Sequence, residues 1–230
     1  MSSDILVGDA NKIDAIVNIA ANGDVVFIVG PNSKRLKVHS LFLTNAAKVF
    51  QAMLGPHFKE GHQLAQPGLT EIELPEDDTE AIETVFNIIH GRNNKVSDTL
   101  NLDELLQVAI IIDKYECHIP LTFALKLWLS SVSTTDPVQM CTLAMVGVVL
   151  RNQATFADAT SALILNHYES YLSLVNMQGN IPVLDPITQL RIAAMLEDRR
   201  SKLQVKLFEE IIARDWHCRS SGMEGRHKPD

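Results

Sequence analysis

The stretch Asp24–His39, DVVFIVGPNSKRLKVH, decides the fold. Its first six residues end in a run of β-branched and aromatic side chains, which is typical of a buried strand. A turn cluster, GPNS at residues 30–33, follows. From Lys34 to His39 apolar and charged residues then alternate, as they do along a strand with one buried face. Two strands joined by a short turn predict a β-hairpin.

Helical and strand patterns continue on the C-terminal side of this hairpin. Ser40 is a favourable N-cap, and residues 41–54 are typical of one helix or two short helical turns that Gly55 and Pro56 end. Residues 61–68 are expected to form a loop. The segment TEIEL at residues 70–74 alternates again and predicts a third strand.

Two capping boxes mark the next helices. Asp77 precedes Glu80 by three residues, and Asn101 precedes Glu104 by the same spacing. In such a box the side chain of the first residue accepts a hydrogen bond from the backbone N–H of the residue three positions later. The side chain of that later residue accepts one from the backbone N–H of the first. Apolar stripes follow both boxes, and Gly91 is expected to end the first of the two helices.

The second half of the chain shows only helical patterns. A helix is expected from Pro120 through Leu129, and SSVSTTDP at residues 130–137 is the best linker candidate. The predicted fold class is therefore α+β, a small sheet capped by helices and followed by an all-helical region. Further helices are expected at residues 140–150, 156–171 and 187–212. The expected domains are residues 9–130 for the sheet and its helices, 131–213 for the helical C-terminal region and 214–230 for a flexible tail.

An amphipathic helix is predicted ahead of the hairpin, from Asp9 to Ala21. A helix this short is marginal alone, so its apolar face has to dock on something. That partner is either the sheet of the same chain or a second copy. The face consists of residues spaced i, i+3, i+4 and i+7, namely Ile13, Ile16, Val17 and Ala20.

Composition excludes several classes of function. The 230 residues are 46% hydrophobic and 21% charged, and the formal net charge of −8 repels nucleic-acid phosphates and anionic membranes. The longest apolar run, residues 140–150, is short of the ~20 residues that span a bilayer. No secretory signal pattern opens the chain. Neither nucleic acid nor a membrane is therefore expected as a partner.

The cysteines point to a reducing compartment. Cys117, Cys141 and Cys218 are odd in number and far apart, and none belongs to a CxxC pair. This usage predicts neither a disulfide framework nor a structural zinc site. A soluble protein of the cytoplasm or nucleus is expected.

Candidate catalytic and metal-binding groups are few. His57 and His62 flank Glu60 but are five residues apart, which does not suit a helical metal pair. The acidic run at residues 76–78 is accounted for by capping of the next helix, and no phosphate-binding or nucleophile-elbow motif is present. Basic residues near the C-terminus alternate with acidic ones, as on a solvated helix face. We expect no catalytic residue, no metal and no cofactor, so the chain is not predicted to be an enzyme.

Six stretches resemble, in the right order and with fitting gaps, the BTB/POZ domain, particularly that of the short BTB proteins of filamentous fungi. The resemblance covers about the first 130 residues and implies a BTB/POZ fold for them. The stretches are Asp24–Val29, Lys37–Leu41, Ala47–Leu54, Glu71–Leu74, Asp78–Gly91 and Leu102–Cys117.

This resemblance implies a protein-interaction module without a catalytic centre. BTB domains typically dimerise through their N-terminal segment and first helices, so the stripe from Ile13 to Ala20 is the implied interface with itself or another BTB protein. Many members also bind a cullin, as adaptors of a ubiquitin ligase. These usually carry a hydrophobic-x-Glu triplet before the third strand, and Phe58, Lys59 and Glu60 stand at that place.

Two hypotheses follow from the resemblance. In the first, the chain is an adaptor that binds a cullin through Phe58 and Glu60 while its C-terminal helices hold a client. In the second, it is a dimerising scaffold or co-regulator without a cullin contact. The exposure of Phe58 discriminates between them, because a hot-spot aromatic has to be available to a partner. A corepressor groove is not expected, since Ser40 stands where repressor-type members carry an arginine after His39.

Overall fold

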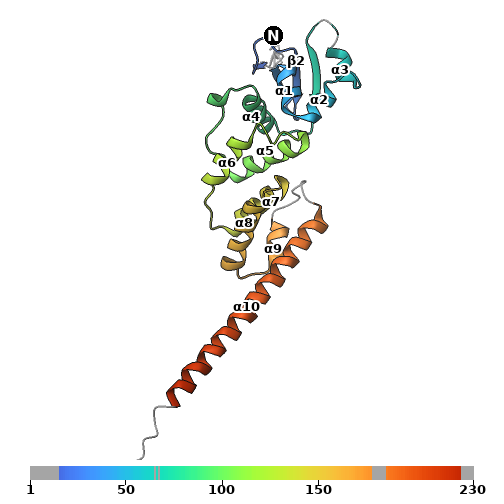
Figure 1. The fold of residues 1–230 in the computed structure, drawn as a ribbon. Helices are drawn as coiled ribbons and strands as arrows, with labels where there is room; N and C mark the ends of the chain where they lie inside the picture. The colour runs from blue at the N-terminus through green and yellow to red at the C-terminus, as the bar shows by residue number, and fades with distance from the viewer. Residues whose placement is uncertain (1–15, 65, 67, 178–184, 224–230) are drawn as a thin grey trace, which may run out of the picture. The chain divides into compact units, whose positions relative to one another are not determined.

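The computed structural model describes residues 16–64, 66, 68–177 and 185–223 (Figure 1). Contacts between residues divide the chain into two compact units, residues 1–133 with 146–153, and residues 134–145 with 154–230. The strands are β1 (Val17–Asn18), β2 (Val25–Val29), β3 (Lys34–Val38) and β4 (Thr70–Leu74). The helices are α1 (Ser40–Ala46), α2 (Lys48–Met53), α3 (Lys59–Leu64), α4 (Thr79–Ile89), the 3-10 helix η1 (Asn93–Lys95), α5 (Leu102–Tyr115), α6 (Thr122–Ser131), α7 (Pro137–Val149), α8 (Gln153–Asn166), α9 (Tyr171–Met177) and α10 (Pro186–Met223).

The first unit is built on a four-stranded mixed sheet in the order β1-β3-β2-β4. β2 and β3 form the predicted antiparallel hairpin, with Phe27 opposite Leu36. β4 lies parallel to β2, and β1 lies parallel to β3. Four of the five residues of β2 are buried, which agrees with its continuous apolar run. The predicted hairpin and third strand are confirmed.

An aromatic core joins the sheet of the first unit to its helices. Phe27 on β2 packs against Phe86 of α4, with ring centroids 5.1 Å apart. Phe50 of α2 stacks on Tyr115 of α5 at 4.5 Å and 8°. All four rings are at most 3% exposed. The helices α2, α4 and α5 therefore close over the sheet, because each contributes one ring to a shared core.

The capping boxes have different outcomes. The box of Asn101 and Glu104 at the start of α5 is confirmed, with both hydrogen bonds formed at 2.9 Å. The box predicted for Asp77 is wrong, because Asp78 is the N-cap of α4 and accepts from the backbone of Ala81 at 2.9 Å.

Asp77 has a different role in the first unit. It is 4% exposed, and one carboxylate oxygen accepts from Tyr115 Oη while the other pairs with Lys114 Nζ, both at 2.5 Å. A carboxylate this deep in the fold has to be paired, and partners on α5 are invisible to a local capping rule.

Two other local predictions are corrected. The helix predicted from Asp9 to Ala21 is wrong for residues 16–21, which form β1 and turns; the earlier residues lie outside the described part. Pairing with β3, including hydrogen bonds from Ile19 and Ala20 to the Lys37 carbonyl, outweighs the helical pattern. The loop predicted at residues 61–68 is wrong in part, because α3 extends to Leu64.

The second unit is helical. Its core contains Met140, Leu163, Tyr171, Leu174, Ala193 and Leu196 from α7, α8, α9 and α10. Arg200 of α10 donates to the carbonyls of His167 and Glu169, forms an ion pair with Glu197 and lies 4.7 Å from the ring centroid of Tyr171. α10 runs to Met223, well past the predicted end at residue 212. Among the described helices, none has the length and apolar character that a membrane crossing requires.

Candidate protein-interaction surface

Phe58 immediately precedes α3 and lies in the turn that follows α2. Its backbone N–H donates to the Gly55 carbonyl at 3.3 Å, and its own carbonyl accepts from the N–H of His62 at 3.1 Å. The residue therefore occupies the N-cap position of the helix, and its side chain is 52% exposed. Lys59 is exposed and Glu60 is half-buried in the first turn. The triplet presents an aromatic ring and a carboxylate at one helix end.

Gly61 fixes the position of this triplet. A Cβ atom at residue 61 would lie 1.8 Å from the Gly55 carbonyl oxygen and 2.9 Å from that of Leu54. Real Cβ atoms do not approach backbone oxygens this closely, so only glycine allows the first turn of α3 to pack on the end of α2. The sequence around Phe58 thus holds this residue at the start of a short helix rather than in a free loop.

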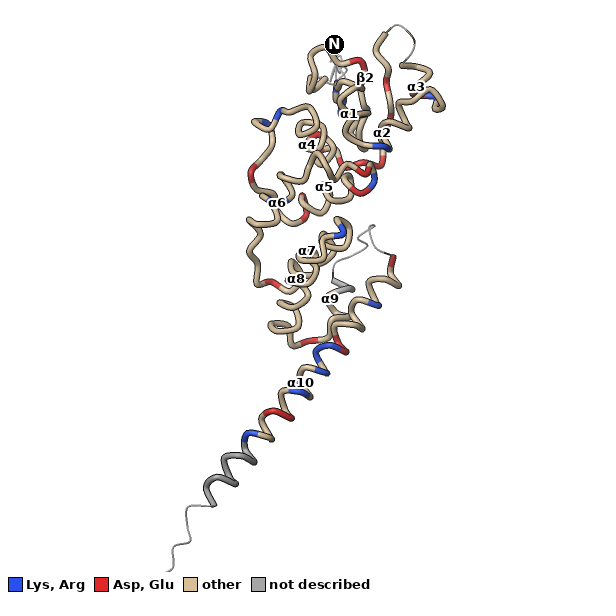
Figure 2. The backbone as a smooth tube through the Cα atoms, viewed as in Figure 1, with Lys and Arg blue, Asp and Glu red and all other residues tan. Residues whose placement is uncertain are grey.

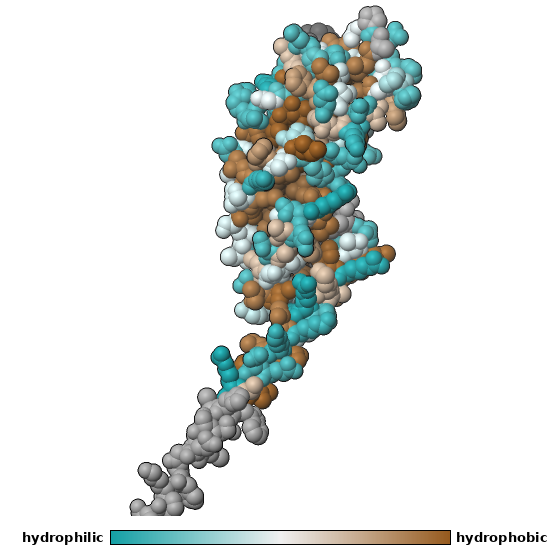
Figure 3. All heavy atoms as spheres, viewed as in Figure 1, coloured by the Kyte–Doolittle hydropathy of each residue, from teal (hydrophilic) through white to brown (hydrophobic). Residues whose placement is uncertain are grey.

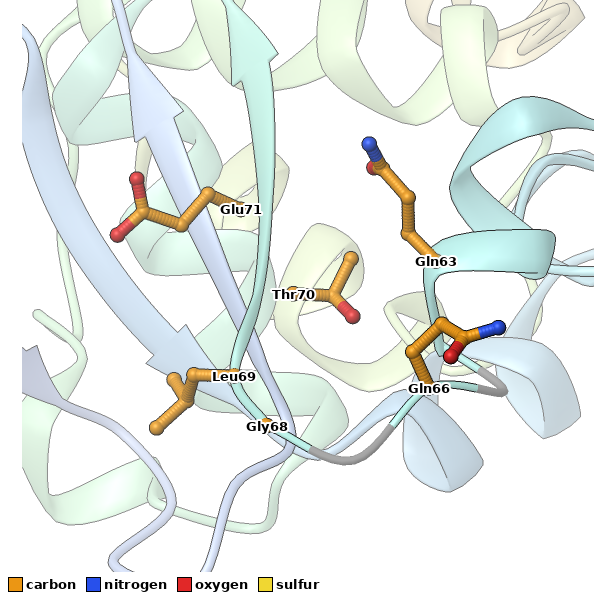
Figure 4. A pocket seen from close by; sticks show the side chains of 6 residues that line it. All are labelled: Gln63, Gln66, Gly68, Leu69, Thr70 and Glu71. Carbon is orange, nitrogen blue, oxygen red and sulfur yellow. The ribbon is translucent and has the colours of Figure 1, made fainter.

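A shallow hollow of about 320 Å³ lies between the end of α3 and the beginning of β4 (Figure 4). Gln63 and Gln66 line one side, and Leu69, Thr70 and Glu71 line the other. The lining contains amides, a hydroxyl and one carboxylate, and Leu69 is 53% exposed. This combination offers hydrogen bonds and apolar contact to a protein partner.

The predicted dimer stripe is not a single helix face. Ile13 lies outside the described residues. Ile16 is 41% exposed, Val17 is part of β1 opposite Leu36, and Ala20 lies half-buried in the bend after that strand. A spacing of i, i+3, i+4 and i+7 gathers side chains only on a helix, so the strand spreads them apart. Their role as a dimer interface stays a prediction.

Other exposed apolar side chains of the first unit were missed at the sequence level. Leu41 and Phe42 of α1 are 58% and 49% exposed, whereas the next residue, Leu43, is fully buried. Three consecutive apolar residues on a helix span about 200° of its circumference, so they cannot all reach one core. That run was the signal that some of them face outward.

A second exposed set lies along α6 and the turn before it. Ile119, Phe123 and Leu127 are 86%, 83% and 48% exposed and follow one another at every fourth residue. Phe123 and Leu127 also line a hollow of about 310 Å³. On the inner side Trp128 is 1% exposed and donates from Nε1 to the Ser97 carbonyl at 2.9 Å. α6 therefore has one face in the core and one face available to a partner.

The corner between β3 and α1 is held by polar contacts. His90 at the end of α4 accepts from the backbone N–H of His39 through Nε2 at 3.0 Å, while its Nδ1 donates to the Phe86 carbonyl at 2.8 Å. This pattern requires the neutral ring. Burial lowers the pKa of His90, with the charges of His39 and Arg92 acting in the same direction, and its hydrogen bonds do not compensate.

The described part of the chain holds no cluster suited to metal binding, since no three His, Cys, Asp or Glu side chains gather there. His57 and His62 are both exposed near the triplet. Cys117 is buried, and burial raises the pKa of its thiol to about 12, which keeps it protonated. Lys, Arg, Asp and Glu are intermixed along the backbone rather than gathered by sign (Figure 2).

Comparison with known proteins gives one family. The model of the BTB/POZ domain matches residues 19–120, which include the hairpin, β4 and the helices α1 to α5. A search of curated proteins found no match. The matched residues contain Phe58, Lys59 and Glu60, together with Leu41 and Phe42.

Proposed function

The chain carries a BTB/POZ domain at residues 19–120, and on that premise we propose that it is a non-enzymatic adaptor of the cytoplasm or nucleus that binds a cullin through Phe58, Lys59 and Glu60. In this proposal the helices after residue 133 hold a client for ubiquitination. BTB domains are protein-interaction modules, so the question is which surface takes which partner.

The observation that carries the proposal is the exposure of Phe58. A ring that is 52% exposed at the start of a short helix can enter a pocket of a partner and act as a hot spot there. Glu60, two positions later, can supply an oriented hydrogen-bond acceptor. The contact between Gly61 and the Gly55 carbonyl limits how much the triplet has to reorganise on binding.

A second function is favoured by a separate observation. Leu41 and Phe42 of α1 expose apolar surface on the matched domain, as does Ile16 before β1. Apolar side chains of this size are suited to an interface with another BTB domain, either of this chain or of a different protein. If no cullin binds, the chain is a dimerising scaffold that uses this surface.

Calorimetric titration of the full chain with a cullin N-terminal domain tests the proposal. The test variant is Phe58→Ala with Glu60→Ala. The chain offers a matched control, because Tyr168 and Glu169 also expose an aromatic ring and a carboxylate. The control variant is Tyr168→Ala with Glu169→Ala.

We expect submicromolar binding by the native chain and a loss of at least about tenfold, ~1.4 kcal/mol, in the test variant. The control variant is expected to bind like the native chain. Absence of a complex with the folded native chain would overturn the adaptor role and leave the scaffold. Equal loss in both variants would show that the triplet at residues 58–60 is not the site.

A further inference from the structure

β4 lies at one edge of the sheet of the first unit. In the strand order β1-β3-β2-β4 its neighbour among the described strands is β2, to which it runs parallel. Two hydrogen bonds at the ends of β4 show which way its backbone groups point. The N–H of Thr70 donates to the Asp24 carbonyl at 3.2 Å. The Leu74 carbonyl accepts from the N–H of Gly30 at 2.9 Å. Thr70 and Leu74 therefore direct their backbone groups toward β2.

Glu71 and Glu73 direct their backbone groups the other way. The N–H and C=O of one strand residue point to the same side, and successive residues alternate between the two sides. Both glutamates are exposed, and within the described part of the chain no hydrogen bond reaches their backbone groups. The outer edge of β4 therefore offers two donors and two acceptors to a further strand. We call these groups the free edge of β4.

The hollow between α3 and β4 lies along the free edge. Glu71 belongs to its lining, although the Glu71 side chain points to the opposite side of β4 from Gln63 and Gln66 (Figure 4). This arrangement agrees with backbone groups of Glu71 that are directed away from β2 and toward the hollow. The amides of Gln63 and Gln66 on the other wall are suited to polar side chains of a bound segment.

The side chains on the free edge are acidic. Glu71 forms an ion pair with Arg35 of β3, whereas Glu73 forms none among the described residues. α3 adds one charge of each sign in its first turn, Lys59 and Glu60, so it does not reverse the sign. Hydrophilic residues predominate on the surface over α3 and β4, at the upper right of Figure 3. Backbone pairing and charge, rather than apolar burial, are therefore what this edge offers to a partner.

We propose that the free edge of β4 is a docking site for an extended segment of another protein that carries lysine or arginine at alternate positions. The segment adds a strand to the sheet by pairing with the backbone groups of Glu71 and Glu73. A residue opposite Glu73 places its side chain on the same face of the sheet, about 5 Å away between Cβ atoms. A basic residue there neutralises the Glu73 carboxylate, and the net charge of −8 attracts such a segment.

A second copy of β4 is not the occupant that this edge favours. Two copies that both used the free edge could pair only antiparallel, so Glu71 and Glu73 would lie opposite glutamates of the other copy. Like charges directly opposite each other on neighbouring strands are destabilising. The acidic side chains therefore keep identical edges apart and leave the edge open to a basic strand. The inference does not rest on the cullin proposal, because the triplet precedes the hollow by the length of α3.

Fluorescence anisotropy with the full chain at low ionic strength tests the charge requirement. The probe is the labelled heptapeptide Thr-Lys-Thr-Lys-Thr-Lys-Thr, which favours an extended backbone and has lysine at every second position. We expect the native chain to bind it with a Kd below about 1 mM. The same peptide with glutamate in place of lysine is expected not to bind.

Two charge reversals locate the site. Glu73→Lys is expected to bind the lysine peptide about tenfold more weakly than the native chain. Glu210→Lys changes the net charge equally at an exposed position on α10, and it is expected to bind like the native chain. Circular dichroism verifies that both variants are folded.

Amide hydrogen exchange tests whether the backbone of β4 is used. In the free chain the amides of Glu71 and Glu73 are expected to exchange faster than that of Thr70, which donates to β2. A saturating amount of the lysine peptide is expected to slow exchange at Glu71 and Glu73 about tenfold. A peptide held by charge alone leaves these two amides unprotected.

Each outcome decides the proposal. Absence of binding at about 1 mM lysine peptide, or equal binding by the native chain and Glu73→Lys, would overturn it. Binding without protection of the Glu71 and Glu73 amides would show attachment to an acidic surface and not strand addition, which also overturns it. Equal weakening in Glu73→Lys and Glu210→Lys would show that net charge, and not the edge of β4, holds the peptide.

Discussion

The carboxylate of Asp24, just before β2, accepts two hydrogen bonds from Ser40, the first residue of α1. The backbone N–H of Ser40 lies 2.7 Å from Oδ1, and its Oγ lies 2.5 Å from Oδ2. His39, at the N-cap position of α1, makes no capping bond with its side chain. Asp24 therefore caps a helix that begins 16 residues further along the chain, and it satisfies a backbone donor that the helix cannot.

This cap predicts an order of stability among variants. Asp24→Ala loses both hydrogen bonds and is expected to lower the free energy of unfolding by about 1–2 kcal/mol. Ser40→Ala loses only the hydroxyl contact and is expected to cost about 0.5–1 kcal/mol. Urea unfolding of the full chain measures both. Equal stability of the two variants would show that the backbone contact contributes nothing.

The Asp24 cap is also sensitive to acid. Burial opposes ionisation of Asp24, but the hydrogen bonds from Ser40 and the nearby His39 outweigh it, and the pKa is lowered. A lowered pKa stabilises the fold above pH 3.8, the ordinary pKa of the group, and this contribution is lost as the pH falls through the folded value. Asp24→Asn should therefore reduce the loss of stability below pH 4, measured by urea midpoints.

His90 predicts a second pH effect. Its pKa is lowered below 6.5 in the fold. Above pH 6.5 the ring is largely neutral in both the folded and the unfolded chain, so it does not affect stability. As the pH falls below 6.5, the unfolded chain binds a proton while folded His90 remains neutral, and the free energy of unfolding decreases. This decrease stops once the pH is below the folded pKa. His90→Gln keeps a hydrogen-bond acceptor for the backbone N–H of His39, but its amide does not bind a proton in this pH range. The variant should lose less stability than the native chain between pH 7.5 and pH 5.5, and parallel curves would contradict this assignment.

The buried contact between Asp77 and Tyr115 predicts a large effect for a small change. Tyr115→Phe removes one hydroxyl and leaves a carboxylate oxygen without its donor in a site that is 4% exposed. We expect a loss of about 1–3 kcal/mol in the free energy of unfolding. Lys114→Met should cost less, because the Lys114 side chain is 44% exposed and water can replace it. A larger loss for Lys114→Met would reverse this ranking.

Gly61 predicts an indirect effect on binding. Gly61→Ala places a methyl group against the Gly55 carbonyl, so the first turn of α3 has to move away from α2. If a cullin binds the triplet, we expect binding weakened about tenfold although Phe58 and Glu60 are intact. Gln51→Ala, an exposed change on the neighbouring helix α2, is the control and should bind normally. Titration calorimetry of both variants makes the comparison.

Arg200 predicts where the second unit is vulnerable. The Arg200 side chain is 18% exposed and donates to two carbonyls in addition to its ion pair, so Arg200→Ala is expected to cost about 2 kcal/mol. Lys202→Ala breaks only a surface pair with Asp198 and should cost less than about 0.5 kcal/mol. In Arg200→Ala, we expect faster amide hydrogen exchange in α8 and α9 than in the native chain. An equal increase throughout the chain would contradict a local role for Arg200.

Much of the fold could be predicted because its signals are local. The apolar run from Val25 to Val29, the alternation after Lys34 and the box of Asn101 with Glu104 each act over a few residues, and all three are confirmed. The helix predicted before Gly23 failed for the opposite reason. Its apolar spacing is real, but hydrogen bonds to β3 decide the backbone of residues 16–20, and the edge of a sheet cannot be read from a short window.

The candidate surface was predictable in part. Phe58, Lys59 and Glu60 were identified through the family resemblance, and the structure adds that the ring is exposed and that Gly61 holds it. Leu41 and Phe42 were missed because periodicity alone does not say which of three adjacent apolar residues faces the core. The free edge of β4 was missed because the alternation at residues 70–74 predicts a strand without showing which of its sides is paired.

The sequence by itself determined the α+β class, the hairpin, the helical second half and the BTB/POZ resemblance, since periodicity and short motifs encode them. Only the tertiary structure decided which polar and apolar groups are used. Asp77 is an internal partner of Tyr115 rather than a cap, and Asp24 caps a distant helix. On α10, Ala193 and Leu196 are the fully buried residues that pack in the core of the second unit. Burial and long-range pairing depend on residues far apart in the chain, so no local pattern fixes them.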